Sequence, residues 1–194
     1  YHPSYRLIHK KYVPFLKLFK HIDNKHPSII SIDGRCASGK TTLSNLLKQI
    51  YDCNVFKMDD FFLQPHQRTK KRLESPGENV DHEREVLIPL SKHEDIKLRK
   101  FNCSTLSIQS AHLIPYKSFN VIEGSYSMHS DLQRYYSYSV FLTVDKQEQL
   151  SRLEKRNPNM LNNFIQRWIP LEELYFKTFS IQDICDIKID TSKA

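Results

Sequence analysis

A glycine-bounded turn near the start of the chain restricts the fold more than any other feature. Gly34 is followed, after four residues, by Gly39-Lys40-Thr41, which matches the phosphate-binding pattern G-x-x-x-x-G-K-[ST]. The apolar stretch 28–32 before it predicts a buried strand, and apolar residues at i, i+3, i+4 and i+7 from position 43 predict a helix after it. Strand, loop and helix therefore occur in the order that the pattern requires.

The residue types in this loop suit the binding of ATP with Mg²⁺. Glycines let backbone N–H groups approach anionic oxygens, and a helix N-terminus adds partial positive charge. We expect Lys40 to reach the β- and γ-phosphates and the Thr41 hydroxyl to bind Mg²⁺. The residues assigned to the nucleotide are Gly34, Ala37, Ser38, Gly39, Lys40, Thr41 and Thr42. A chance match in an αβ turn is the alternative, and the agreement of strand, loop and helix argues against it.

Length and composition indicate one globular α/β domain. The chain has 194 residues, 39% of them hydrophobic and 26% charged, and no apolar run is long enough to cross a membrane. The net charge of +7 suits a protein that binds polyanions, and a nucleoside triphosphate accounts for it without nucleic acid. We therefore expect no nucleic-acid or membrane partner, while association into a homo-oligomer is left open.

The cysteines indicate a reducing compartment. Cys36, Cys53, Cys103 and Cys185 form no C-x-x-C pair and are widely separated, as expected for free thiols rather than a disulfide framework or a zinc site. The opening residues also lack the order of a signal peptide. Together these features predict a cytoplasmic protein.

Residues 1–27 precede the predicted domain, which spans residues 28–194. Apolar residues between basic ones predict an amphipathic helix over residues 5–22, interrupted near Pro14. We expect this helix to pack on the domain. A basic amphipathic segment lying on a membrane surface is the alternative.

The remaining pattern predicts a three-layer α/β/α fold with a mainly parallel sheet. Apolar, β-prone runs predict further strands over residues 54–58, 119–124, 138–144 and 187–190. Helical spacing predicts helices that begin near residue 81 and span residues 147–156, 161–170 and 171–179. Residues 96–103 and 107–116 predict a small hairpin appended to the sheet.

Acidic residues follow two of these strands, at the sheet edge where parallel sheets bind ligands. Asp59 and Asp60 follow the second strand, and a carboxylate there can accept the proton of an attacking hydroxyl. A helix cap or a surface turn is the alternative. Glu123 ends the third strand and is the expected partner of Mg²⁺ or its water, the alternative being a purely structural acid.

Two arginines lie one turn apart on the helix predicted over residues 147–156. Guanidinium groups at the spacing of Arg152 and Arg156 could clamp the charge of a transferring phosphate, or could form a solvated helix face. Residues 63–80 are rich in proline, glycine and basic residues and predict a mobile surface loop. Asp81 follows this loop, where it could also be a plain N-cap.

These motifs resemble those of the uridine kinase-like branch of the P-loop kinases, relatives of phosphoribulokinase and the bacterial pantothenate kinases. Asp33-Gly34 leading into the loop is similar to the first family motif, and Asp59-Asp60-Phe61-Phe62 resembles the Asp-x-Phe-Tyr motif. The resemblance implies that Asp59 is the base, that Asp81 holds ribose hydroxyls, and that Glu123 is the Mg²⁺-associated acid. It extends from about residue 28 to the end.

Departures from the family pattern concern the acceptor. Phe62 replaces a tyrosine, and Phe101-Asn102 replaces a Tyr-Asp pair that lines the base pocket. The lid of the family carries an arginine-rich run, of which Arg152, Lys155 and Arg156 remain here. The stretch from Arg167 to Glu172 is similar to proteins described as uridine kinase-like.

The sequence thus predicts an ATP-dependent kinase that phosphorylates a hydroxyl of a small molecule, with a nucleoside as the expected acceptor. We assign Asp59, Lys40, Arg152 and Arg156 to catalysis, and Asp81, Phe62 and Arg84 to the acceptor. One alternative is a kinase for a pantothenate-like alcohol or a sugar phosphate. Another is a nucleotide-binding switch, which Asp59 argues against because nucleotide binding alone needs no base.

Overall fold

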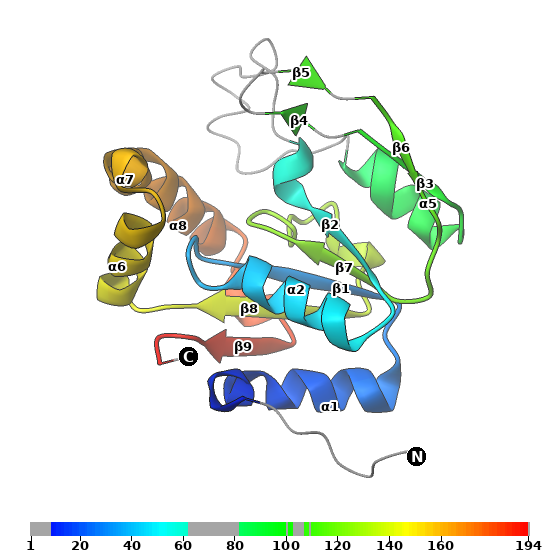
Figure 1. The fold of residues 1–194 in the computed structure, drawn as a ribbon, viewed down its shortest axis with the longest axis horizontal. Helices are drawn as coiled ribbons and strands as arrows, with labels where there is room; N and C mark the ends of the chain where they lie inside the picture. Colours follow the sequence, from blue (N-terminus) through cyan, green and yellow to red (C-terminus); the bar gives the residue numbers. More distant parts are fainter. Residues whose placement is uncertain (1–8, 62–81, 100, 103–106, 109, 194) are drawn as a thin grey trace.

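A parallel sheet lies at the centre of the computed structural model, which describes residues 9–61, 82–99, 101–102, 107–108 and 110–193 (Figure 1). Among these residues five strands pair in the order β2-β7-β1-β8-β9, all parallel. Their bounds are β1 Ile29–Gly34, β2 Asn54–Lys57, β7 Asn120–Glu123, β8 Tyr138–Thr143 and β9 Ile187–Asp190. The consecutive strands β7 and β8 pair with opposite sides of β1, so the carboxyl end of β1 is the switch point where such sheets bind ligands.

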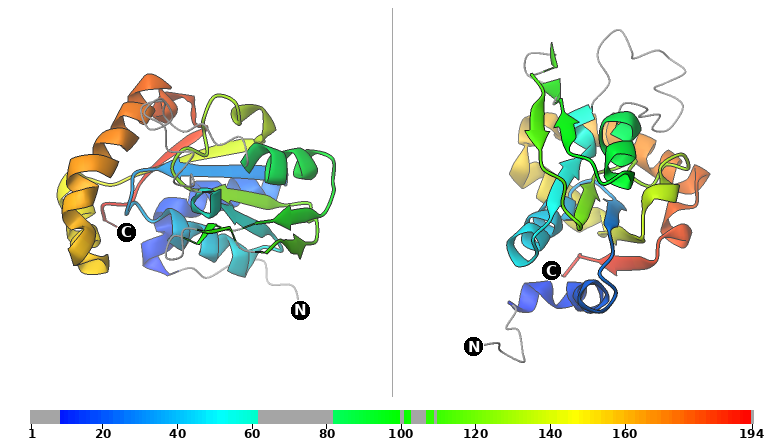
Figure 2. Two further views of the ribbon diagram at one scale, coloured as in Figure 1. Left: turned by 90° about the horizontal axis from the view of Figure 1, so that it is seen from above. Right: turned by 90° about the vertical axis from the view of Figure 1, so that its right-hand side faces the viewer.

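Helices cover both faces of this sheet (Figure 2). They are α1 Leu16–Lys25, α2 Lys40–Ile50, α5 Ile88–Ser91, α6 Lys146–Arg156, α7 Leu161–Asn163, α8 Ile169–Thr178 and α9 Ile181–Ile184. Ile30 and Ile32 of β1 pack in a cluster with α1 and α2, whereas Ile29 packs with α5. A third cluster joins β8 to α8 and α9. The prediction of a three-layer α/β/α fold is confirmed.

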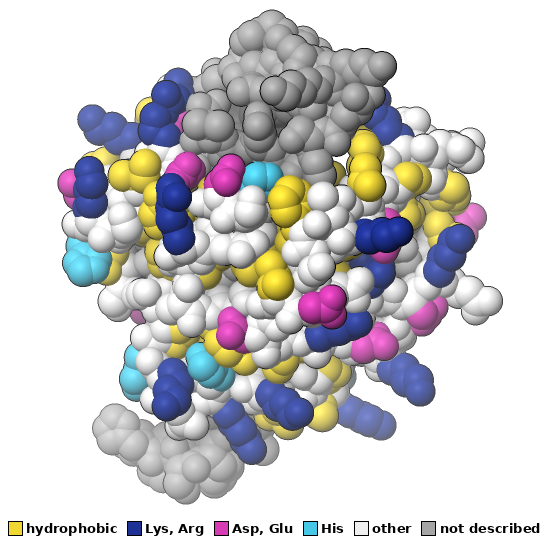
Figure 3. All heavy atoms as spheres, turned by 180° about the vertical axis from the view of Figure 1, so that it is seen from behind, with side chains coloured by type: hydrophobic (Ala, Val, Ile, Leu, Met, Phe, Trp, Pro, Cys, Tyr) yellow, Lys and Arg dark blue, Asp and Glu magenta, His cyan; other side chains and the backbone are white. Residues whose placement is uncertain are grey.

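The segment before β1 packs on the sheet. A 3-10 helix at Lys10–Phe15 contains Pro14 and leads into α1, whose Leu18 and Ile22 are buried in the same cluster as β1. Phe15 and Phe19 are also buried in this cluster, whereas Val13 and Leu16 and the lysines of the segment are exposed. The face of the molecule shown in Figure 3 carries several basic side chains along its lower edge. In the part of the chain that the structure describes, no helix has the length and apolar character needed to span a membrane. The division of the chain after residue 27 stays a prediction.

The appended hairpin is present as two short antiparallel pairs. Strand β3 Ile96–Leu98 pairs with β6 His112–Ile114, and β4 Phe101–Asn102 pairs with β5 Ser107–Ile108.

A π-helical segment precedes each of two prolines, and this differs from the prediction. The helix expected to end at Pro170 instead continues from α7 through the π-helical residues Phe164–Trp168 into α8. A proline in a regular α-helix clashes with the carbonyl four residues earlier. Here the Ile169 N–H donates to the carbonyl of Phe164, five residues back, and this wider turn accommodates the proline. The π-helical residues Glu83–Leu87 precede Pro89 in the same way.

Candidate active site

The loop between β1 and α2 has a backbone that only glycine allows at its two ends. Gly34 has φ +135°, and a Cβ there would lie 2.0 Å from the carbonyl oxygen of Leu142 in β8. Gly39 has φ +93° and is the N-cap of α2. These conformations allow the phosphate-binding loop (Gly34–Thr41) to lie close against the sheet. They also place the N-terminus of α2 at the end of the loop.

Lys40 lies across this loop. Its Nζ donates hydrogen bonds to the carbonyl oxygens of Gly34, at 2.6 Å, and Arg35, at 2.9 Å. The next two residues, Thr41 and Thr42, are exposed in the first turn of α2. The end of the loop therefore carries a cation, a helix N-terminus and exposed hydroxyls, which is the donor set that a phosphate chain requires.

Glu123 faces Thr41 from the end of β7. The Thr41 hydroxyl donates a 3.1 Å hydrogen bond to Oε1 of Glu123, while the buried Oε2 has no hydrogen-bond partner among the described residues. Burial raises the pKa of Glu123, against the opposing effects of Lys40 and of the Thr41 hydrogen bond. A carboxylate oxygen without a donor beside a hydroxyl fits Mg²⁺, which prefers oxygen ligands. The described residues contain no cluster of three acidic, His or Cys side chains, but Mg²⁺ bound to phosphates and water needs none.

Asp59 lies near enough to Glu123 for the two carboxylates to interact electrostatically. It is exposed in the 3-10 helix Met58–Phe61, directly after β2, and its charge contributes to the raised pKa of Glu123. Lys57, two residues earlier, pairs in register with Glu123 across β2 and β7. The sheet therefore brings Asp59, Glu123, Thr41 and Lys40 to one edge, as expected from the sequence.

The two arginines of α6 make different contacts. Arg152 donates to the carbonyl oxygens of Ala37, at 3.3 Å, and Thr191, at 2.6 Å, and so lies against the outer side of the loop. The Thr191 hydroxyl donates in turn to the carbonyl of Ser38 at 2.8 Å. The exposed Arg156 lies with its guanidinium 5.7 Å from the ring centre of Phe164. Their role as a phosphate clamp stays a prediction.

Most of the predicted acceptor residues cannot be placed. Phe62, Asp81 and the loop predicted over residues 63–80 lie outside the described residues. Arg84 is exposed on the π-helical segment Glu83–Leu87. The acceptor roles of Asp81, Phe62 and Arg84 therefore stay predictions.

Comparison with known proteins bears on the fold of the chain. No family model and no curated protein sequence matches the chain. Among solved structures, a possible uridine kinase from Bacillus stearothermophilus aligns over 91% of this chain and 97% of its own, with a TM-score of 0.70 and 20% identity. The protein TT1252 from Thermus thermophilus aligns over 86% and 89%, with a TM-score of 0.51 and 16% identity. The chain has the fold of the uridine kinase-like P-loop kinases.

A buried carboxylate in this uridine kinase-like fold was missed as a site residue. Asp33, at the end of β1, accepts hydrogen bonds from the backbone N–H groups of Gly34, at 2.6 Å, and Met128, at 2.9 Å, and from the Tyr175 hydroxyl at 2.8 Å. Burial raises its pKa to about 6 in spite of these bonds and of Lys40. The signal in the sequence was an acid in an apolar strand, which requires buried partners.

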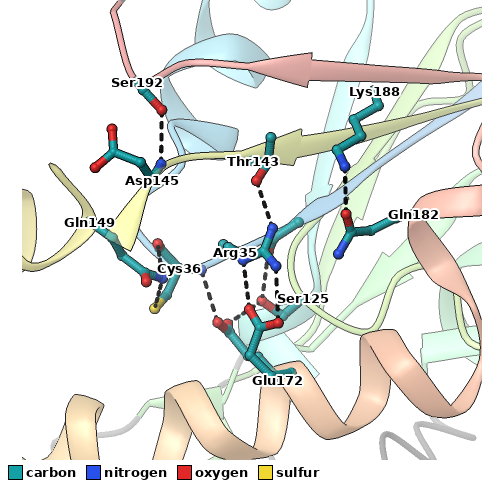
Figure 4. A network of polar contacts seen from close by, with 12 residues as sticks. Arg35, Cys36, Ser125, Thr143, Asp145, Gln149, Glu172, Gln182, Lys188 and Ser192 are labelled. Carbon is teal, nitrogen blue, oxygen red and sulfur yellow. Dashed lines mark hydrogen bonds and ion pairs between the residues drawn. The ribbon is translucent and has the colours of Figure 1, made fainter. Parts of the chain in front are cut away.

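Helix α8 supplies a second set of contacts that sequence reasoning missed (Figure 4). Glu172 accepts hydrogen bonds from the backbone N–H of Cys36 and the hydroxyl of Ser125. Glu173 forms a two-pronged ion pair with Arg35, with N–O distances of 2.6 and 3.0 Å. Adjacent glutamates on a helix ordinarily indicate a solvated face, so the pattern alone gave no reason to place them beside the loop.

Proposed function

We propose that the chain transfers the γ-phosphoryl group of ATP to a hydroxyl of a small molecule, and that this acceptor is a nucleoside. The observation that carries the proposal is the meeting of Lys40, Thr41, Glu123 and Asp59 at one edge of the sheet. A protein that only binds a nucleotide needs no exposed carboxylate beside the phosphate site. Asp59 therefore favours a kinase over a nucleotide-binding switch.

Each of these residues has a chemical role in the proposed reaction. Lys40 would exchange the carbonyl oxygens of Gly34 and Arg35 for phosphate oxygens and hold the β- and γ-phosphates in place. Thr41 and Glu123 would hold Mg²⁺, which when bound neutralises charge on the phosphates. Asp59 would orient the acceptor hydroxyl and take its proton. Catalysis is then mostly positioning and electrostatic stabilisation.

The nucleoside assignment rests on the sequence and on the fold. The stretch Asn79-Val80-Asp81-His82 resembles a ribose-binding segment, and the fold is shared with a structure described as a possible uridine kinase. The aromatic residue Phe62 could stack on a base without the hydroxyl that a tyrosine would add. A pantothenate-like alcohol or a sugar phosphate is the competing acceptor.

A coupled assay of ADP release from Mg·ATP, over a panel of nucleosides, vitamins and sugar phosphates, tests the proposal. We expect release above background with one or more nucleosides, and its loss in Lys40→Ala, because no neighbour duplicates that charge. Release with a non-nucleoside alcohol alone would overturn the nucleoside assignment. Calorimetric binding of Mg·ATP without release for any acceptor would favour the switch instead.

A further inference from the structure

Glu172 of α8 binds two segments that meet at the phosphate-binding loop. Its Oε2 accepts a 2.9 Å hydrogen bond from the backbone N–H of Cys36, inside the loop, and its Oε1 accepts a 2.6 Å hydrogen bond from the Ser125 hydroxyl. Ser125 follows Gly124 at the end of β7, close to Glu123. Only 7% of Glu172 is exposed, so water does not compete for these two bonds.

Two further residues of α8 hold the same loop. Glu173 pairs with Arg35, which also donates a 2.6 Å hydrogen bond from Nη1 to the Thr143 hydroxyl of β8. Tyr175 donates to Asp33, immediately before the loop. The helix therefore contacts three of the four consecutive residues 33–36 through side chains spaced within one turn.

These contacts fix the direction of the loop's polar groups before any ligand arrives. The Cys36 N–H is directed toward α8, and the side-chain amide of Gln149 holds the Cys36 carbonyl at 3.0 Å on the other side (Figure 4). A loop already held in one conformation loses less conformational entropy when it binds a phosphate chain. Helix α8 also follows directly from the segment 146–168, so a shift of that segment would be transmitted to the loop through Glu172.

We propose that Glu172 is a positioning residue of the phosphate-binding loop, which fixes the Cys36 amide and the Ser125 hydroxyl and so sets the affinity of the loop for the nucleotide phosphates. The inference rests on the proposed function in one respect, that the loop binds Mg·ATP. It gives a role to Glu172, the last residue of the stretch from Arg167 to Glu172, which the catalytic roles proposed above leave without one.

The test compares Glu172→Ala, Glu172→Gln and wild type by calorimetric titration with Mg·ATP, with thermal unfolding measured in parallel. We expect Glu172→Ala to weaken binding by about tenfold or more, because two hydrogen bonds of a charged group are lost. Glu172→Gln should stay within about threefold of wild type, because its amide can accept from Cys36 and donate to Ser125. Glu154→Ala, which removes an exposed acid from α6, is the matched control and should bind as wild type does.

A second readout does not depend on nucleotide binding. Burial, with the charge of Glu172 next, raises the pKa of the Cys36 thiol to about 12. Iodoacetamide labelling of Cys36, followed by mass spectrometry, should be about tenfold faster in Glu172→Ala than in Glu172→Gln, because both variants lack the charge but only Glu172→Ala releases the loop and exposes the thiol.

The outcomes separate the two proposals. A lower unfolding temperature in Glu172→Ala with wild-type affinity for Mg·ATP would overturn the positioning role. If wild type itself does not bind Mg·ATP, the proposed function fails, and Cys36 labelling then decides on the loop. Equal labelling rates in Glu172→Ala and Glu172→Gln overturn the positioning by Glu172, and a faster rate in Glu172→Ala supports it. Should Glu172→Ala not fold, Glu172→Asp replaces it, since the shorter side chain keeps the charge but cannot reach both partners.

Discussion

The Thr41 hydroxyl donates a 3.1 Å hydrogen bond to Oε1 of Glu123 and so joins the first turn of α2 to the end of β7. The other carboxylate oxygen of Glu123 is buried with no hydrogen-bond partner in the described part of the chain. Burial raises the pKa of this carboxyl group, so its negative charge is disfavoured until a cation approaches. A bound Mg²⁺ would supply that cation.

Replacing Glu123 by Gln should therefore separate metal binding from folding. We expect the Mg²⁺ concentration for half-maximal ADP release to rise by about tenfold or more, because an amide oxygen binds a hard cation more weakly than a carboxylate. The free energy of unfolding should not fall, because a neutral side chain suits this buried position. A Mg²⁺ titration and urea unfolding measure the two effects, with Glu154→Gln on the exposed face of α6 as control. An unchanged Mg²⁺ requirement would remove Glu123 from the metal site.

The two acids after β2 should differ in their effect on turnover. Asp59 is exposed beside Glu123, whereas Asp60 is half-buried. If Asp59 is the base, Asp59→Asn lowers kcat by about two to four orders of magnitude and leaves Mg·ATP affinity nearly intact. Asp60→Asn is the matched variant and should be milder. A greater loss of kcat in a folded Asp60→Asn protein would reverse the two roles.

The prediction for Asp81 depends on the sequence alone. A carboxylate that accepts hydrogen bonds from two ribose hydroxyls is left partly unpaired by a 2′-deoxy analogue, at a cost of roughly 1–3 kcal/mol. We therefore expect ribonucleosides to exceed 2′-deoxyribonucleosides by about one to two orders of magnitude in kcat/KM. Asp81→Ala should remove most of that preference. Equal kcat/KM for the two sugars in wild type would leave Asp81 as a helix cap.

The strands and the loop were predicted well from the sequence because short runs of neighbouring residues determine them. The closing strand β9 has the predicted bounds Ile187–Asp190, and β1, β2, β7 and β8 lie within one or two residues of theirs. Buried parallel strands are short apolar runs, which a sequence displays directly. The continuous helix through Pro170 was not predicted, because a π-helical turn that accommodates a proline has no distinct spacing of apolar residues.

The parts of the candidate site that the sequence did not predict depend on contacts between residues that are far apart in the chain. Asp33 and Tyr175 are separated by 142 positions, and Cys36 and Glu172 by 136, so no periodicity connects them. Arg152 and Arg156 lie four residues apart in α6, as the spacing predicted, but the contact of Arg152 with Thr191 depends on the fold, which brings Thr191 from the end of β9. The sequence pattern therefore predicted the phosphate-binding loop, whereas the residues of α8 that contact the loop can be identified only in the folded structure.

Asp33 should make the stability of the protein depend on pH in an unusual direction. Its pKa is raised from 3.8 to about 6 by burial, so between these values the folded protein keeps a proton that the unfolded chain has released. The stabilisation is therefore complete below about pH 4 and is lost as the pH rises to about 6, above which both states are ionised. A shift of this size corresponds to roughly 3 kcal/mol.

Urea unfolding at several values between pH 4 and pH 7, for wild type and Asp33→Ala, isolates this contribution from that of other groups. The difference in unfolding free energy, wild type minus Asp33→Ala, should fall by roughly 3 kcal/mol across this range. Tyr175→Phe, which removes a hydrogen bond that favours the ionised carboxylate, should raise the pKa of Asp33 further and move the loss of stability to higher pH. A difference that stays flat would mean that Asp33 ionises in the folded protein as readily as in the unfolded chain, and one that grows as the pH rises would mean that it ionises more readily when folded.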